Sequence, residues 1–263
     1  MDFDFSENDE GILFRPYDKR DKTAAMALLS EFWHINSLAR KDDIRELMLN
    51  REFHRALSSN NYCEVAEADG MFKGIIFADI NVIDAKNRPM DKVIFHGYDT
   101  KLKALVGEDF RSYTQLLLIE RTRTELLTSL APPVPRTENN VPGMNVDTYF
   151  DPDISVRLRT NANIDKSMSP VASAYVDTGV RFDAELSLIL SDPDCPEAAL
   201  LLFERLKTVL RENLARNYFV FSNTFCDYRL FQLKRCVKWA EKEITLISNN
   251  PEQHKCRIYA YDF

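Results

Sequence analysis

The sequence predicts a mixed α/β (α+β) protein with a mostly antiparallel central sheet flanked by helices. Residues 182–192 alternate and then run apolar, as a strand buried on both faces does. Residues 197–214 place apolar side chains three and four apart, which is typical of an amphipathic helix, and 218–226 are aromatic and β-branched like a second buried strand. Because two strands joined by one helix over this distance form a right-handed crossover, we expect the strands beginning at Ala184 and Tyr218 to be parallel neighbours.

The residues before this central unit predict a strand, two helices and a hairpin. The strand ends at Pro16, and the helices span 18 to about 38 and about 42 to 57. The dipeptide Asp69-Gly70 lies between two strand patterns, which is a strong hairpin signal. The first part of the chain therefore packs a hairpin and two helices onto the sheet.

Residues 82–181 form an insertion that is too long for a simple loop, so we expect it to carry structure of its own. Residues 109–130 predict a helix with a wide apolar face, and edge strands are expected near 156–160 and 170–179. We interpret the chain as one domain, 1–263, in which the insertion is either a lid over the acceptor or a helical layer that stabilises the fold or a homodimer.

The last part of the chain predicts a short helix and two closing strands. The helix covers 227–237, so that the central unit extends to Trp239. The antiparallel strands begin at Glu241 and Lys255 and are joined through a turn rich in asparagine.

Composition excludes several classes of protein. With 45% hydrophobic and 29% charged residues the chain is globular, and its net charge of −7 argues against a general nucleic-acid or membrane-surface binder. No apolar run approaches the ~20 residues of a membrane span, and the acidic start is unlike a signal peptide, so we expect a cytoplasmic protein. The five cysteines and four histidines lack the spacing of a disulfide framework or a metal site.

The segments FDAELSLILSDPD, LFERL and FVFSNTFCDYRLF, followed by KWAE, resemble the acyl-CoA-binding half of the GNAT superfamily of acetyltransferases. The strand, helices and hairpin of residues 12–81 and the two closing strands match the family's order of elements. The resemblance implies a GNAT-like fold, acetyl-CoA as cosubstrate, and acetyl transfer to a small-molecule or peptide amine.

One departure from the family lies at the turn that would hold the CoA pyrophosphate. Family members carry an Arg-Gly-x-Gly-x-Gly type turn there, whereas residues 192–203 contain neither glycine nor arginine. A helix N-terminus attracts phosphate through free amides and its dipole. Asp192, Asp194 and Glu197 would instead cap the helix, worth ~0.5–2 kcal/mol, and repel a pyrophosphate. The turn is therefore either an acid-capped helix start, which we favour, or a phosphate cradle.

The resemblance also implies residues that hold the cosubstrate. Leu188, Ile189 and Leu190 match the strand whose main chain pairs with the pantetheine arm in the family. Asn223 either donates to the same arm or makes a hydrogen bond at a strand end.

Two residues are implied in catalysis. Glu185, in the strand beside the thioester, is either the base that accepts the amine's proton or an outward-facing strand residue. The family's tyrosine acid is matched by Phe231, so Tyr228, one helical turn earlier, either replaces it or is simply packed. Two hypotheses follow: a divergent acyl-CoA-dependent N-acyltransferase, or a catalytically inactive GNAT-fold binding or assembly protein with a degenerate active site.

Overall fold

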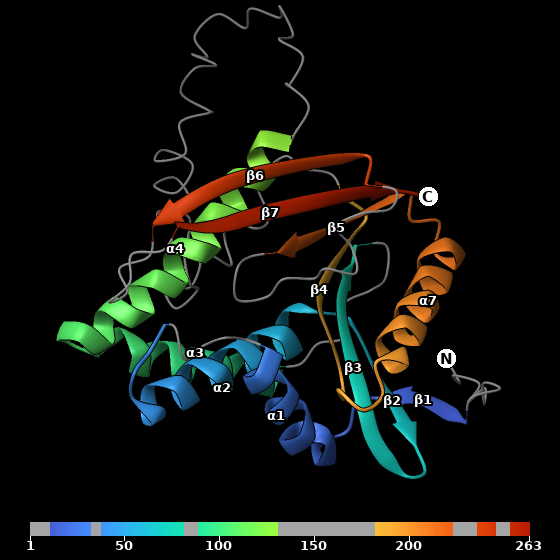
Figure 1. The fold of residues 1–263 in the computed structure, drawn as a ribbon, viewed down its shortest axis with the longest axis horizontal. Coiled ribbons are helices and arrows are strands. Elements are labelled where there is room, and N and C mark those ends of the chain that lie inside the picture. Colours follow the sequence, from blue (N-terminus) through green and yellow to red (C-terminus); the bar gives the residue numbers. More distant parts are fainter. Residues whose placement is uncertain (1–10, 33–37, 82–88, 131–181, 223–235, 246–252) are drawn as a thin grey trace, which may run out of the picture.

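A computed structural model describes residues 11–32, 38–81, 89–130, 182–222, 236–245 and 253–263 (Figure 1). Its strands are β1 (Ile12–Pro16), β2 (Tyr62–Ala68), β3 (Met71–Ile80), β4 (Ala184–Ser191), β5 (Asn217–Ser222), β6 (Lys238–Thr245) and β7 (Gln253–Asp262). Its helices are α1 (Lys22–Phe32), α2 (Asp42–Ser59), α3 (Pro89–Lys103), α4 (Gly107–Leu130) and α7 (Glu197–Glu212), with a 3₁₀ turn at Lys19–Asp21.

The strands form one sheet in the order β1-β2-β3-β4-β5-β7-β6. Every neighbouring pair is antiparallel except β4 and β5, which are parallel, with Ala184 opposite Tyr218. Helix α7 connects these two strands. The predicted mixed, mostly antiparallel sheet flanked by helices is therefore confirmed, and so is the parallel pair at its centre, as the GNAT resemblance implies.

Two local motifs show how the sequence sets the chain reversals. Asp69 and Gly70 have φ angles of 52° and 73°, the left-handed pair that a two-residue hairpin turn requires. Before α1, the Asp18 side chain accepts from the Arg20 amide, while Asp21 accepts from the Asp18 amide. Arg15 of β1 then binds both carboxylate oxygens of Asp21 at 2.7 Å, which fixes the helix start to the edge of the sheet.

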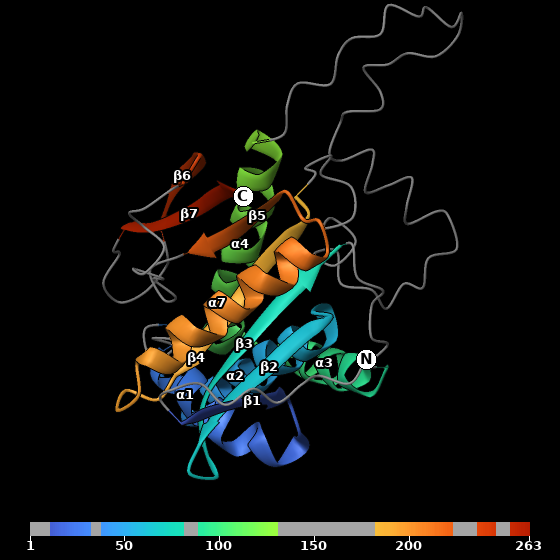
Figure 2. The ribbon, with the colours of Figure 1, turned by 90° about the vertical axis from the view of Figure 1, so that its right-hand side faces the viewer.

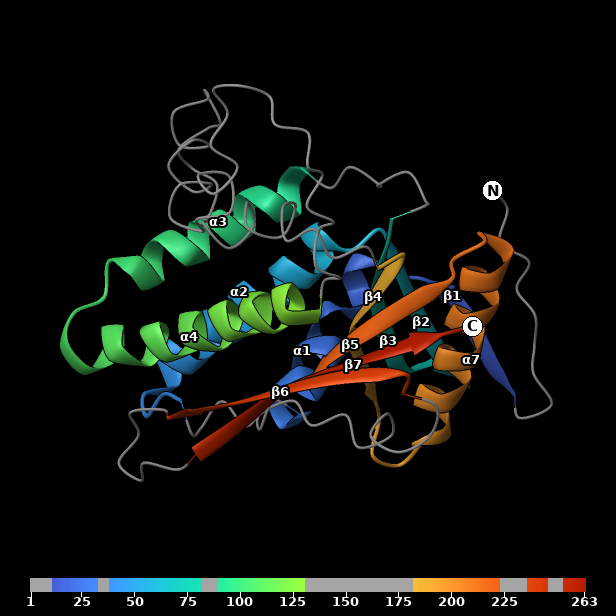
Figure 3. The ribbon, with the colours of Figure 1, turned by 90° about the horizontal axis from the view of Figure 1, so that it is seen from above.

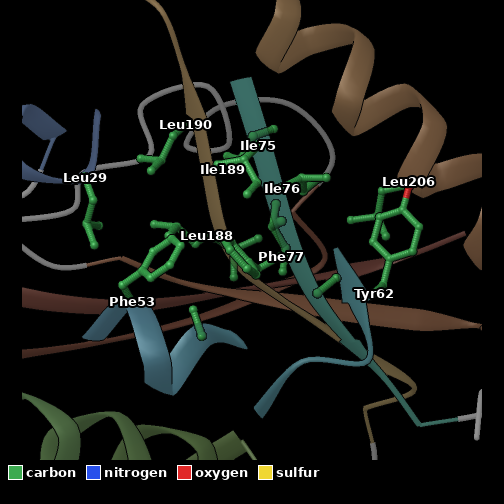
Figure 4. Packing of buried hydrophobic residues seen from close by; sticks show 14 of the residues in the cluster. Leu29, Phe53, Tyr62, Ile75, Ile76, Phe77, Leu188, Ile189, Leu190 and Leu206 are labelled. Atoms are coloured by element: carbon green, nitrogen blue, oxygen red, sulfur yellow. The ribbon is translucent and has the colours of Figure 1, made fainter. Parts of the chain in front are cut away.

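Helices cover both faces of the sheet. Leu188 and Leu190 lie on the face toward Leu29 of α1 and Phe53 of α2, whereas Leu206 of α7 lies on the opposite face (Figure 4). Helix α4 runs along β6 and β7 on the same face as α1 and α2 (Figure 3). The core thus has an α7 side and a side built by α1, α2 and α4.

A buried arginine joins α2, α3 and α4. Arg51 is fully buried, and its Nε lies 2.9 Å from Asp99 Oδ1 of α3 while its Nη1 lies 2.7 Å from Glu120 Oε1 of α4. It also pairs with Glu52. Because an unpaired buried charge is strongly unfavourable, the arginine and its carboxylates hold the three helices in one arrangement.

Two features differ from the sequence-based expectation. Helix α3 was not predicted, and with α4 it makes the described part of the insertion a packed helical layer. The first closing strand was expected to begin at Glu241, but β6 begins at Lys238, so that Lys238 and Trp239, the end of the expected central unit, belong to a strand. The reason is that β6 pairs residue by residue with β7, so edge pairing overrides the local pattern. The strands expected near 156–160 and 170–179 lie outside the described residues.

Candidate functional site

The parallel strands β4 and β5 pair over a short distance and then separate. Three register pairs join them, from Ala184 with Tyr218 to Leu186 with Val220. Beyond Leu186, β4 continues to Ser191 beside β3, while β5 pairs with β7 (Figure 2). Within the described residues, the side of Leu188–Leu190 that faces away from β3 has no strand partner. An extended chain laid along this side would find main-chain donors and acceptors, as an added strand does.

A β-bulge lies where the two strands begin to separate. Phe77 of β3 is opposite Leu188 and Ala78 is opposite Leu186, so Ser187 is an extra residue in β4. The Ser187 hydroxyl donates to Asn60 Oδ1 at 2.7 Å, at the end of α2. The bulge therefore ties the opening between β4 and β5 to the helix that covers this face.

Two carboxylates from neighbouring strands meet next to the bulge. Asp79 of β3 and Glu185 of β4 are directly paired, and Glu185 is also paired with Phe219 of β5, so the three side chains share one face of the sheet. Arg123 of α4 lies over them, with its Nη2 at 2.5 Å and its Nε at 3.2 Å from the two Glu185 carboxylate oxygens. Its guanidinium carbon is 5.5 Å from the centre of the Phe219 ring.

The two acids differ in their environment. Glu185 is 8% exposed and ion-paired with Arg123, whereas Asp79 is half-buried and its carboxylate accepts no hydrogen bond from any described residue. Burial, and then the nearby Glu185 charge, raise the pKa of Asp79 to about 6, because Arg123 offsets only part of these effects. Asp79 is thus the carboxylate best able to exchange a proton near neutral pH.

The arginine is brought to this face by the insertion. Glu120, which holds Arg51, and Arg123 are three residues apart on α4, so the buried pairing that fixes the helix also fixes Arg123. At the end of α4, Lys238 of β6 donates to the Leu130 carbonyl at 3.0 Å. The described part of the insertion therefore contributes directly to the candidate site.

The turn from β4 to α7 satisfies most of its own amides. The Asp194 amide donates to Asp192 Oδ1 at 3.0 Å, and the Cys195 amide donates to the Asp192 carbonyl at 2.8 Å. Further along, the Ala198 amide donates to the Cys195 carbonyl at 3.1 Å and the Ala199 amide donates to the Pro196 carbonyl at 3.3 Å. Pro193 and Pro196 have no amide hydrogen. The expected capping by acidic side chains is wrong, because Pro196 is the N-cap residue and no side chain accepts a hydrogen bond at the cap. The amides that already donate within the turn do not fit a pyrophosphate.

Acidic charge dominates the same turn. Hydrogen bonds from the Asp194 amide and the Lys73 ammonium lower the pKa of Asp192. The pKa of Glu197 is lowered by the backbone amide of Glu197 itself and then by the Cys195 side chain. Both are therefore ionised at neutral pH, and the one nearby cation among the described residues, Lys73, is bound to Asp192 Oδ2 at 3.1 Å.

Of the residues implied by sequence, some are brought together. Glu185 lies beside the opening with its side chain buried, and Leu188, Ile189 and Leu190 form the side of β4 that lacks a partner. Asn223 and Tyr228, like Phe231, lie outside the described residues, so their roles stay predictions. Sequence reasoning missed Asp79 and Arg123. An acidic residue within the apolar run 75–80 was the available signal for Asp79, and no local signal links Arg123 to β4.

Among the residues that the structure describes, no group of three or more histidine, cysteine, aspartate or glutamate side chains is placed to hold a metal ion. None of the described helices has the length and apolar character needed to cross a membrane.

No protein-family model and no curated protein sequence matches the chain significantly. Among solved structures, it is similar to an agmatine N-acetyltransferase variant in its apo form, at 11% identity over 96% of this chain and 100% of that one, with a TM-score of 0.43. It is also similar to the Drosophila melanogaster polyamine N-acetyltransferase, at 12% identity over 96% and 100% with a TM-score of 0.41. For arylalkylamine N-acetyltransferase 2 from Aedes aegypti the identity is 13% over 95% and 98%, with a TM-score of 0.42. Likenesses at this level transfer no activity, so function is argued from this chain's own geometry.

Proposed function

We propose that the protein is a divergent N-acyltransferase that moves an acyl group from a thioester to a primary amine. The observation that supports this most is the separation of β4 from β5 immediately beside the Asp79–Glu185 pair. The unpartnered side of Leu188–Leu190 suits the amide-bearing arm of a pantetheine-type thioester such as acetyl-CoA. The carboxylates at the start of β4 suit an amine.

The reaction requires a group that removes a proton from the amine. As the nitrogen attacks the thioester carbonyl, the N–C bond forms, the C–S bond breaks and the sulfur leaves as a thiolate, while the amine's proton passes to a base. Asp79 suits this role because its carboxylate is not hydrogen-bonded to any described residue and its pKa is raised to about 6. Glu185, the base predicted from sequence, is held by Arg123 and in this proposal positions the arginine beside Asp79.

The charge of the cluster also suits a cationic acceptor. Two carboxylates face one guanidinium, so the ionised group is net negative and half-buried, where electrostatic attraction is weakly screened. An alkylammonium ion would therefore be drawn to this face before it loses its proton.

The test is thiol release from acetyl-CoA and from S-acetyl-pantetheine in the presence of primary amines such as agmatine and an arylalkylamine. We expect release that depends on the amine and that falls ~10²–10⁴-fold in Asp79→Asn. If thiol release falls by that factor in Glu185→Gln while Asp79→Asn stays active, then Glu185 is the base instead. If no amine supports release from either thioester, the proposed function is wrong.

The alternative function is that of a catalytically inactive binding protein. The occupied amides at the start of α7 favour it, since they leave no site for the diphosphate of CoA. In that case the protein would bind a ligand along β4 without turnover. A cytoplasmic location and a homodimer are further proposals, which fractionation of cells and sedimentation of the purified protein would test.

A further inference from the structure

The open side of β4 leads directly to the acidic turn. Leu188–Leu190 are followed by Ser191, where β4 ends, and then by Asp192. The carboxylates Asp79 and Glu185 lie near the other end of β4. A donor whose reactive end lies near these carboxylates, and whose arm follows the strand, therefore extends toward the turn between β4 and α7.

The charges and amides of the turn between β4 and α7 do not favour binding of a phosphate group of the donor. Asp192, Asp194 and Glu197 bring three carboxylates within six residues, against the ammonium of Lys73, so the local charge is net negative. The amides of Asp194, Cys195, Ala198 and Ala199, which would otherwise be available to a phosphate, already donate to acceptors in the turn. A diphosphate there would meet the repulsion of three carboxylates, and the one ammonium beside them, that of Lys73, is already bound to Asp192.

The glycine nearest the turn does not open space for a ligand. Gly74 pairs with Ser191, and a Cβ built on it would lie 2.8 Å from the Leu190 carbonyl oxygen and 3.3 Å from a Leu202 methyl carbon. This glycine serves the close packing of β3, β4 and α7. Within the described residues, the turn thus offers neither the row of free amides nor the glycine backbone that phosphate binding uses.

We propose that this protein recognises its acyl donor through the thioester arm alone, so that a nucleotide diphosphate contributes no affinity. Acyl thioesters of the pantetheine type that carry no phosphate are then donors as good as acetyl-CoA. The inference rests on the proposed function, since it concerns the donor of the same reaction. An enzyme that recognises CoA is expected to bind the diphosphate as well. Here we assign recognition of the donor to β4 and repulsion of phosphate to the start of α7.

The experiment compares the affinities of the full-length protein for S-acetyl-pantetheine and acetyl-CoA by isothermal titration calorimetry at low ionic strength. We expect the two dissociation constants to agree within ~3-fold, because a single charge-assisted hydrogen bond to the diphosphate would already favour acetyl-CoA about tenfold. Added salt should strengthen the binding of acetyl-CoA and leave S-acetyl-pantetheine unaffected, since screening weakens repulsion of the charged ligand.

A charge variant tests the cause. Asp194 is exposed, and its carboxylate accepts no hydrogen bond from a described residue, so Asp194→Asn removes one charge without breaking the turn. We expect ~3-fold tighter binding of acetyl-CoA relative to S-acetyl-pantetheine. Glu212→Gln is the matched control, because Glu212 is exposed at the other end of α7, roughly 20 Å away. It should leave the ratio unchanged.

The outcomes separate this inference from the proposed function. Acetyl-CoA binding tenfold or more tightly than S-acetyl-pantetheine would overturn the inference and leave the acyltransferase proposal standing. An unchanged ratio of the two dissociation constants in Asp194→Asn would also contradict the inference, because it would show that the acidic turn does not repel acetyl-CoA. If neither thioester binds at millimolar concentration, the proposed function fails and the inference fails with it.

Discussion

Replacing Asp79 by asparagine should stabilise the protein at alkaline pH and not at acidic pH. The pKa of Asp79 is raised from 3.8 to about 6 in the folded protein, so the folded state holds a proton that the unfolded state releases. The associated stabilisation is complete below pH 3.8 and is lost as the pH rises through about 6. Above that pH, folding keeps a half-buried charge beside Glu185, and asparagine removes this cost.

The size of the effect follows from the shift. A rise from 3.8 to about 6 corresponds to ~3 kcal/mol. Because the side chain keeps contact with solvent, we expect Asp79→Asn to gain ~1–3 kcal/mol in the free energy of unfolding near pH 8 and almost nothing near pH 4.

Urea unfolding of the wild type and the variant at several pH values between these limits measures this difference. Asp262→Asn is the control, because Asp262 is exposed at the end of β7 and its replacement should give no pH-dependent gain. A stability difference between Asp79→Asn and the wild type that stays the same from pH 4 to pH 8 would refute the reasoning. The same variant should remove the rise of activity with pH near 6, measured as thiol release.

Four further substitutions test the packing of the protein by urea unfolding. Arg123→Met removes the cation between the two acids, so it should destabilise more near pH 8 than near pH 4; equal losses would contradict the ion pairing. Arg51→Met leaves several buried carboxylates without their partner and should cost ~3–5 kcal/mol near neutral pH, and a loss below ~1 kcal/mol would show that the network is not buried as described. Gly74→Ala places a Cβ 2.8 Å from the Leu190 carbonyl and should cost ~1–3 kcal/mol, whereas Gly97→Ala, which meets open space within α3, should gain up to ~1 kcal/mol.

The order of elements was predictable where local chemistry sets it. The left-handed angles of Asp69 and Gly70 follow from a dipeptide that favours such a turn. In helix α7, Leu202, Leu206 and Leu210 are buried, as their helical spacing indicated. Leu214, the last residue of the predicted pattern, is exposed and lies beyond the end of the helix. In both cases the information lies within a few residues of the chain.

Helix α3 and strand β6 gave only weak signals in the sequence, for a physical reason. In α3, Met90 and Val93 are exposed, with Phe95 and Leu102 buried, so the apolar residues do not mark one face. In β6, Trp239 is 60% exposed and most neighbouring residues are exposed as well, so the alternation typical of a half-buried strand is absent. Pairing with β7 makes it a strand, and that contact is not encoded locally.

By itself the sequence determined β4, α7 and β5, the parallel arrangement of the strands at Ala184 and Tyr218, and the acidic character of the turn before α7. Only the tertiary structure decided which carboxylate is suited to move a proton. Asp79, Glu185 and Arg123 come from three distant segments, and their meeting on one sheet face pairs one acid with the arginine and leaves the other half-buried. A pKa depends on burial and on neighbouring charge, and both are set by packing between elements that are far apart in the chain.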